Sequence, residues 1–90
     1  MCRNIRPLFN FEPAATDDDV RGASLQFVRK VSGFTKPSQA NEAAFDKAVD
    51  DISAIVGDLL AALVTSAPAK DREVEAARAR ARAQQRFGVA

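Results

Sequence analysis

Hydrophobic residues recur with helical spacing in three stretches of the chain, and the first runs from residue 16 to residue 33. Thr16 and the three aspartates after it form a helix start signal, because the hydroxyl can accept a hydrogen bond from a backbone N–H and the acids suit the positive end of the dipole. Gly33 suits the left-handed position that ends many helices. The apolar positions between them are Val20, Ala23, Phe27, Val28 and Val31. We therefore predict a helix over 16–33.

The second stretch, residues 39–65, carries the longest apolar face. Its apolar positions are Phe45, Ala48, Val49, Ile52, Ile55, Val56, Leu59, Leu60 and Leu63. Either Ser38 or Asn41 can cap its first turn. Gly57 costs about 1 kcal/mol against alanine inside a helix, which indicates that another element approaches closely there. Because this face is larger than one neighbouring helix covers, we expect Phe9 and Phe11 to cover part of it and a second subunit to cover the rest.

The third stretch, residues 70–87, is rich in alanine and arginine, which are strong helix formers. Its apolar side is shallow and consists of Val74, Ala77 and Ala81. So small a face contributes little burial. We expect the C-terminal half of this helix to fray or to need a partner.

Residues 1–15 have the pattern of an extended arm, in which Phe9 and Phe11 lie on the same side of a period-two alternation. Pro7 and Pro13 argue against a central strand, and we expect no strand partner within the chain. The arm is expected to lie over the helices and to bury its two phenylalanine rings. Exchange of the arm with a second subunit is the alternative.

These elements predict one all-α domain over residues 1–90. It consists of an extended N-terminal arm, an antiparallel helical hairpin and a third Arg/Ala-rich helix. A chain of 90 residues is enough for one small domain with a thin core.

Composition excludes several kinds of chemistry. The chain has no histidine and one cysteine, so a Ser–His–Asp triad, a histidine-centred metal site, structural zinc and an internal disulfide are ruled out. We see neither the apolar run of a signal peptide nor a stretch long enough to span a bilayer. A lone cysteine fits a reducing compartment. We expect a cytoplasmic protein with no cofactor, no catalytic residues, no metal ligands and no membrane contact.

The formal net charge of +1 hides a strong segmentation of charge. Residues at four-residue spacing form an acidic stripe on the second predicted helix and a basic stripe on the third. The acidic stripe is Glu42, Asp46 and Asp50, and the basic stripe is Arg78, Arg82 and Arg86. Complementary stripes favour contact between the two helices, within a chain or between chains. Two solvated faces are the alternative.

Two groups of cations are candidate binding sites. The first lies around the start of the second predicted helix and could hold an anion, although ordinary helix capping explains it equally well. It consists of Arg29, Lys30, Lys36 and Ser38. The second lies on the third helix and could contact a nucleic-acid backbone or an acidic protein, with a solvated or subunit-pairing helix as the alternative. It consists of Arg78, Arg80, Arg82 and Arg86.

Cys2 is the remaining chemical candidate. Removal of Met1 would place an amine and a thiol on one residue, which makes a good nucleophile and a bidentate metal chelator. Arg3 and Arg6 would favour the thiolate. An inert thiol on a tethered arm is the alternative.

Several strings of the sequence are long and specific. They are Met1-Cys2-Arg3-Asn4-Ile5, Phe11-Glu12-Pro13, the run from Leu25 to Phe34, Lys36-Pro37-Ser38, Asn41 and Ala44-Phe45-Asp46. In these strings the chain resembles a small bacterial family of uncharacterised proteins, a domain of unknown function, over residues 1 to about 87. The resemblance implies a short cytoplasmic bacterial protein and assigns no site residue. It directs attention to Cys2 and to the loop between the first two helices.

We favour a non-enzymatic protein-interaction module that self-associates, with a dimer as the expected homo-oligomer and an unidentified protein as a further partner. The second hypothesis is nucleic-acid binding through the third helix and the loop of cations. The third is thiol or metal chemistry at Cys2. The residues favour a protein that is not an enzyme and leave the question open.

Overall fold

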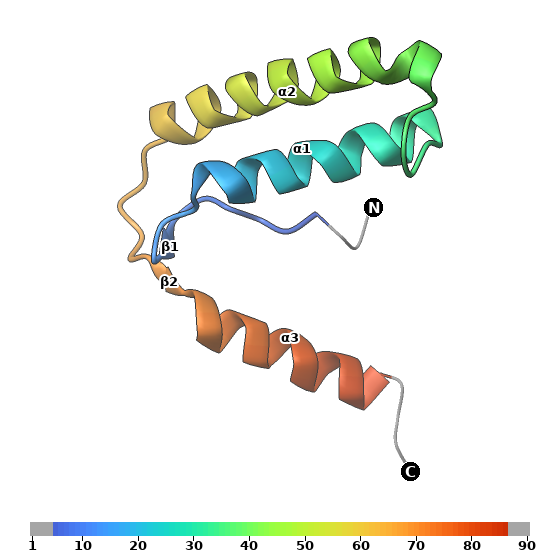
Figure 1. Cartoon of the computed structure of the whole chain (residues 1–90). Helices are drawn as coiled ribbons and strands as arrows, with labels where there is room; N and C mark the ends of the chain where they lie inside the picture. Colours follow the sequence, from blue (N-terminus) through green and yellow to red (C-terminus); the bar gives the residue numbers. More distant parts are fainter. Residues whose placement is uncertain (1–4, 87–90) are drawn as a thin grey trace.

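The computed structural model describes residues 5–86. Three helices, α1 (Asp17–Ser32), α2 (Glu42–Ala62) and α3 (Arg72–Arg86), account for most of this part of the chain. A 3₁₀ turn, η1 (Gln39–Asn41), precedes α2, and two strands of two residues each are β1 (Phe11–Glu12) and β2 (Lys70–Asp71). Helices α1 and α2 form an antiparallel hairpin, while α3 leaves on the other side of α1 from α2 (Figure 1). The predicted all-α fold class is confirmed.

The ends of α1 form as the sequence predicts. Thr16 Oγ1 accepts a hydrogen bond from the Asp19 N–H at 3.1 Å, and the Asp19 carboxylate accepts one from the Thr16 N–H at 2.9 Å. This reciprocal capping box satisfies two backbone donors that the helix leaves unpaired. At the other end Gly33 has φ 79° and donates its N–H to the Arg29 carbonyl.

The core lies in the contact between α1 and α2. Val28 of α1 and Phe45 and Val49 of α2 are buried against one another. Leu25, Ala48 and Ile52 pack around them. Further along α1, Ser24 is buried and donates its hydroxyl to the Val20 carbonyl at 3.0 Å, so this buried polar group is satisfied. The hairpin therefore depends on one narrow apolar contact.

The start of α2 differs from the prediction. Neither Ser38 nor Asn41 makes a capping hydrogen bond with its side chain. Instead Asn41 Nδ2 donates to Ser38 Oγ at 2.9 Å, and the Asn41 N–H donates to the Ser38 carbonyl at 2.9 Å. The two side chains satisfy each other across η1, so neither is directed at the first turn of α2.

The expectation that the arm has no strand partner within the chain is wrong. Strand β1 pairs in parallel with β2, in the register Phe11 with Lys70 and Glu12 with Asp71. The Lys70 N–H donates to the Asn10 carbonyl at 2.8 Å. The arm thus holds the segment between α2 and α3, and both phenylalanine rings of the arm are half-buried.

The expectation of a close approach at Gly57 is also wrong. A Cβ atom built at this position would meet no other atom within 4 Å. Gly57 is half-buried inside α2, with space beside it. It therefore weakens the helix without making room for a neighbour.

Gly57→Ala should raise the free energy of unfolding by about 1 kcal/mol, the helix propensity of alanine over glycine. Gly33→Ala is the matched control, and it should lower the free energy of unfolding by about 1–2 kcal/mol because an alanine is strained at a φ of 79°. Urea titration followed by circular dichroism measures both. A destabilised Gly57→Ala would show that the space beside α2 is filled.

Candidate functional site

The cations predicted as an anion site are used in different ways in the loop between α1 and α2. Arg29 Nε donates to the Thr35 carbonyl at 2.9 Å, so this guanidinium braces the loop. Ser38 Oγ accepts from Asn41, as described above. Lys30 and Lys36 are exposed. Anion binding at these four residues stays a prediction.

The arginines of α3 do not form one uniform group. Arg78 Nη1 lies 2.9 Å from Glu75 Oε2, in an ion pair within the helix. Arg80 and Arg82 are exposed, and two residues turn an α-helix by about 200°, so these two side chains start on opposite sides. The side chain of Arg86 lies outside the described residues. Nucleic-acid binding through α3 stays a prediction.

Cys2 also lies outside the described residues, so thiol or metal chemistry there stays a prediction. Among residues 5–86, no group of three acidic side chains gathers where it could hold a metal ion. Over the same residues, no helix is both long enough and apolar enough to cross a membrane.

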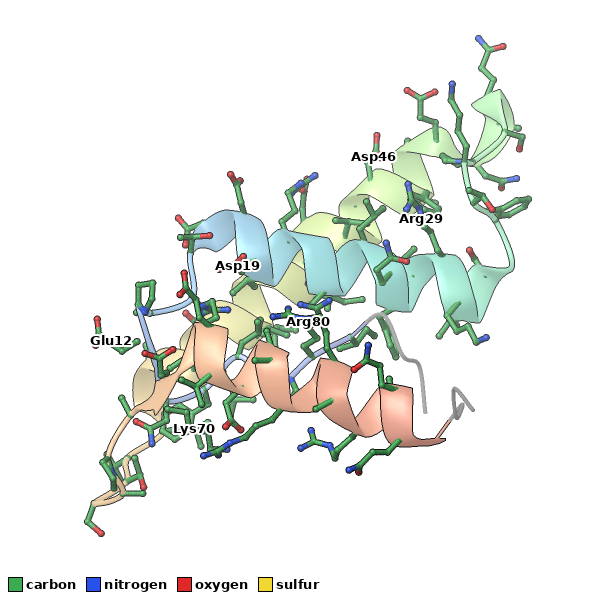
Figure 2. The ribbon with its side chains drawn as sticks, turned by 90° about the horizontal axis from the view of Figure 1, so that it is seen from below. Glu12, Asp19, Arg29, Asp46, Lys70 and Arg80 are labelled. Atoms are coloured by element: carbon green, nitrogen blue, oxygen red, sulfur yellow. The ribbon has the colours of Figure 1, made fainter. Side chains whose placement is uncertain are left out.

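Among the described side chains, the acidic stripe on α2 forms no ion pair with Arg78 or Arg82 of the basic stripe on α3. Asp50 Oδ1 instead lies 2.6 Å from Arg21 Nη1 of α1. Figure 2 labels Asp46 toward the η1 end of α2 and Arg80 on α3. Figure 1 shows α1 between these two helices. The prediction of a contact within one chain is wrong because β2 directs α3 away from α2. Contact between chains remains open.

A second acid of α2 is paired along its own helix. Asp51 Oδ2 lies 2.6 Å from Lys47 Nζ, one turn earlier. This hydrogen bond, together with the negative charge of Asp51, raises the pKa of Lys47 above its ordinary value. Both side chains are largely exposed, so the pair contributes little to stability.

The arm and the segment before α3 are joined by a set of contacts that we call the clasp. It comprises residues 10–13 on one side and residues 67–72 on the other. Asn10 Nδ2 lies 3.3 Å from the Ala67 carbonyl and 3.1 Å from the Pro68 carbonyl, in addition to the strand pairing. Arg72 Nη2 donates to the Pro13 carbonyl at 3.0 Å. Segments more than fifty residues apart in the sequence are therefore fixed together.

Two cations lie on the Phe11 ring at the centre of the clasp. Lys70 Nζ is 5.7 Å from the ring centroid and Arg72 Cζ is 5.3 Å from it. Such contacts contribute about 0.5–1 kcal/mol each at exposed sites. Phe11 thus fixes the first residues of α3 to the arm.

The sequence gives little sign of the clasp. Strands of two residues have no measurable periodicity, and their partners are far apart along the chain. Asn10 is the one usable signal, because it adopts φ 64° and asparagine tolerates this left-handed conformation. It marks a turn in the arm but not the partner of that turn.

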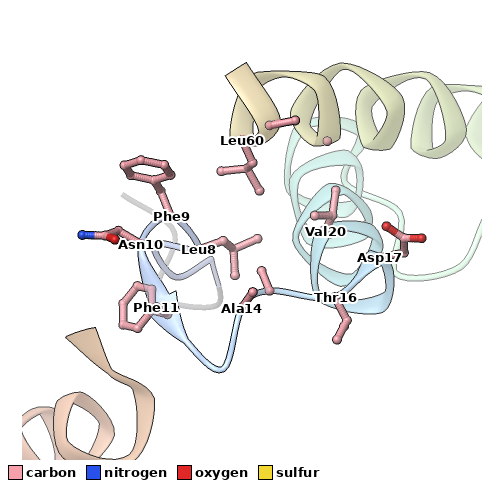
Figure 3. Close-up of a pocket in the computed structure, with 12 residues that line it drawn as sticks. Leu8, Phe9, Asn10, Phe11, Ala14, Thr16, Asp17, Val20 and Leu60 are labelled. Atoms are coloured by element: carbon pink, nitrogen blue, oxygen red, sulfur yellow. The ribbon is translucent and has the colours of Figure 1, made fainter. Parts of the chain in front are cut away.

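A pocket of about 370 Å³ lies between the arm, the start of α1 and the end of α2. Figure 3 shows Leu8, Val20 and Leu60 pointing toward this space, while the Asn10 amide and the Asp17 carboxylate point away from it. Ligand pockets combine an apolar lining with a few polar groups that converge on the ligand. The third labelled polar residue, Thr16, uses its hydroxyl in the capping box. These polar side chains do not converge on the pocket, which we describe as the space under the arm.

The carboxyl of Asp19, in the capping box, has a lowered pKa. The hydrogen bond from the Thr16 backbone is the main cause that lowers the pKa of Asp19 below 3.8. The Thr16 hydroxyl and the charge of Arg72 lower it further, while desolvation opposes them. The shift follows from the place of Asp19 in the capping box.

The longest helix carries an exposed apolar strip that we call the outer stripe of α2. It consists of Ile55, 67% exposed, and Leu59, 53% exposed, one helical turn apart. It flanks the core-facing side of α2, and Asp50 with its ion pair to Arg21 lies on the opposite flank. Asp58 borders the outer stripe on its solvent side, three residues from Ile55.

Helix α3 has one covered and one uncovered side. Arg72, Glu75 and Ala76, which share a face, are half-buried. The opposite face, which we call the outer side of α3, carries its apolar residues. They are Val74, Ala77 and Ala81, all exposed. The main contact of α3 is with β2, so the outer side has no cover within the described chain.

Fold and surface together define a small helical-hairpin protein with an appended helix and two uncovered apolar strips. The chain belongs to the family described as "Uncharacterized conserved protein (DUF2277)", whose model matches residues 1–78. The matched span includes the hairpin and the clasp and ends within α3. Searches of curated proteins and of solved structures gave no match.

Phe11→Ala should loosen the clasp. Loss of two cation–π contacts of about 0.5–1 kcal/mol each should raise the rate of tryptic cleavage after Lys70 and Arg72 roughly fivefold or more. Phe34→Ala, in the loop between α1 and α2, is the control and should leave this rate unchanged. Mass spectrometry of the fragments gives the rates. Equal cleavage of both variants and the wild type would contradict the role of the ring.

Asp19→Asn should weaken the acid sensitivity of folding. A carboxyl whose pKa is lowered in the folded state stabilises it above the unfolded value of 3.8, and this contribution is lost as the pH falls through the lower folded pKa. Urea midpoints at about pH 5 and about pH 2.5 should therefore differ less in Asp19→Asn than in the wild type. Asp18→Asn, in the same helical turn, should keep the wild-type difference. A wild-type difference in Asp19→Asn would contradict this assignment.

Proposed function

We propose that this chain is a non-enzymatic protein-interaction module that self-associates, and that a second copy covers its outer stripe. We also propose that it acts in the cytoplasm, where a single unpaired cysteine is stable in its reduced form. The proposal concerns assembly because the described residues present uncovered surface rather than a cluster of reactive groups.

The exposure of the outer stripe carries the proposal. Ile55 and Leu59 lie in the longest helix of the chain, and each keeps more than half of its surface in water. Large apolar side chains contribute about 1.5–3 kcal/mol each on full burial, so an uncovered pair provides a substantial driving force for association. Other large exposed hydrophobic residues are Phe27, Val31, Phe34, Leu63, Val64 and Val74.

The thin core supports the same proposal. The buried hydrophobic residues of the described chain are Val20, Val28, Phe45 and Val49. Small domains commonly supplement so small a core by oligomerisation. A second copy is the simplest partner, because its uncovered strips are the same and the chain is close to electrically neutral.

Ile55→Ser with Leu59→Ser should weaken the dimer at least about tenfold, which corresponds to about 1.4 kcal/mol. The expected wild-type result is a dimer whose fraction rises with protein concentration in sedimentation equilibrium. Val64→Ser is the control, because Val64 is 92% exposed and lies beyond the end of α2. Circular dichroism should show unchanged helix content in both variants.

Two results would contradict this function. One is a wild-type chain that stays monomeric at the highest concentration reached. The other is a dimer of undiminished affinity after both serine substitutions, which would place the interface elsewhere.

A further inference from the structure

We infer that α3 of a second copy docks on the outer stripe of α2, with its arginine edge against Asp58. This inference rests on the proposed function and names the element that covers the stripe. Two features of the described chain match across such a contact, and a third prevents a chain from making it with its own α3.

One apolar surface carries large side chains and the other carries mostly small ones. The outer stripe presents two large side chains, Ile55 and Leu59. The outer side of α3 presents Val74, 45% exposed, and small alanines that allow the axis of a neighbouring helix to come close. A helix of 15 residues is only marginally stable alone in water, so α3 gains stability from such a seat.

The charges match along one edge. Asp58 is exposed and forms no ion pair with a lysine or arginine in the described chain. Arg82 is likewise exposed and unpaired among the described side chains, and it follows Arg78 by one turn at the edge of the outer side of α3. With the apolar strips in contact, this edge of α3 can lie along the Asp58 edge of α2. Opposite charges placed so fix the orientation of the contact.

The clasp excludes the same contact within one chain. Asn10 and Phe11 hold residues 67–72, and α3 consequently leaves on the far side of α1 from α2 (Figure 1). The stripe and the helix that fits it therefore belong to one chain but cannot meet in it. Two copies related by a two-fold axis satisfy both at once, since each α3 then covers the α2 of the other.

A charge reversal with a matched control tests this contact between α3 and the outer stripe. Asp58→Arg should weaken the dimer about tenfold, because it places like charges side by side. Asp46→Arg makes the same change at an exposed aspartate on the opposite flank of α2 and should leave affinity within about twofold. Arg82→Glu should weaken the dimer like Asp58→Arg, and the double variant Asp58→Arg with Arg82→Glu should recover most of the loss. Sedimentation equilibrium of the full chain at low salt measures each affinity.

The outcomes separate this inference from the function beneath it. If the wild-type dimer tolerates Asp58→Arg, or is broken by Asp46→Arg instead, the chain self-associates but α3 does not dock on the outer stripe as inferred. Failure of the double variant to recover affinity also overturns this docking. A wild-type monomer overturns the proposed function itself.

Discussion

The contact between α1 and α2 is the interaction on which the rest of the structure depends. Val28, Phe45 and Val49 meet there, and few other side chains of the described chain are buried. One face of α2 is used in this contact, and no other helix of the described chain covers the neighbouring face of α2. The apolar surface of α2 is wider than the area that α1 covers. One side of α2 is therefore buried against α1, and the next side is exposed.

The helices could be predicted from the sequence because their signals are local. Thr16 and Gly33 mark the ends of α1 through the chemistry of one residue each, and the structure places both in the expected roles. The start of α2 was harder to predict, because the side chains of Ser38 and Asn41 can either cap the helix or hydrogen-bond to each other. The predicted close approach at Gly57 was wrong, because a glycine in a helix indicates lost stability but does not show that a neighbouring element lies beside it.

The clasp could not be predicted, and it decides where α3 lies. Phe11 and Lys70 are brought together by the fold, while the pattern around each describes only its own segment. The expected contact between the charged stripes failed within the chain for this reason. Asp50 forms an ion pair with Arg21 of α1, and the arm directs α3 away from α2. A small pairing of strands thus leaves an apolar strip and its complement uncovered on the same molecule.

Hydrogen exchange of the α3 amides over a range of protein concentrations tests this account most directly. If a second copy covers α3, the amides from Val74 to Gln85 exchange fast in the monomer and become protected as the chain associates. The amides around Val28 and Val49 are already protected within one chain, and they gain only the increase in global stability that dimerisation brings. Exchange in α3 that stays fast at every concentration, in a chain that nevertheless dimerises, would contradict the account.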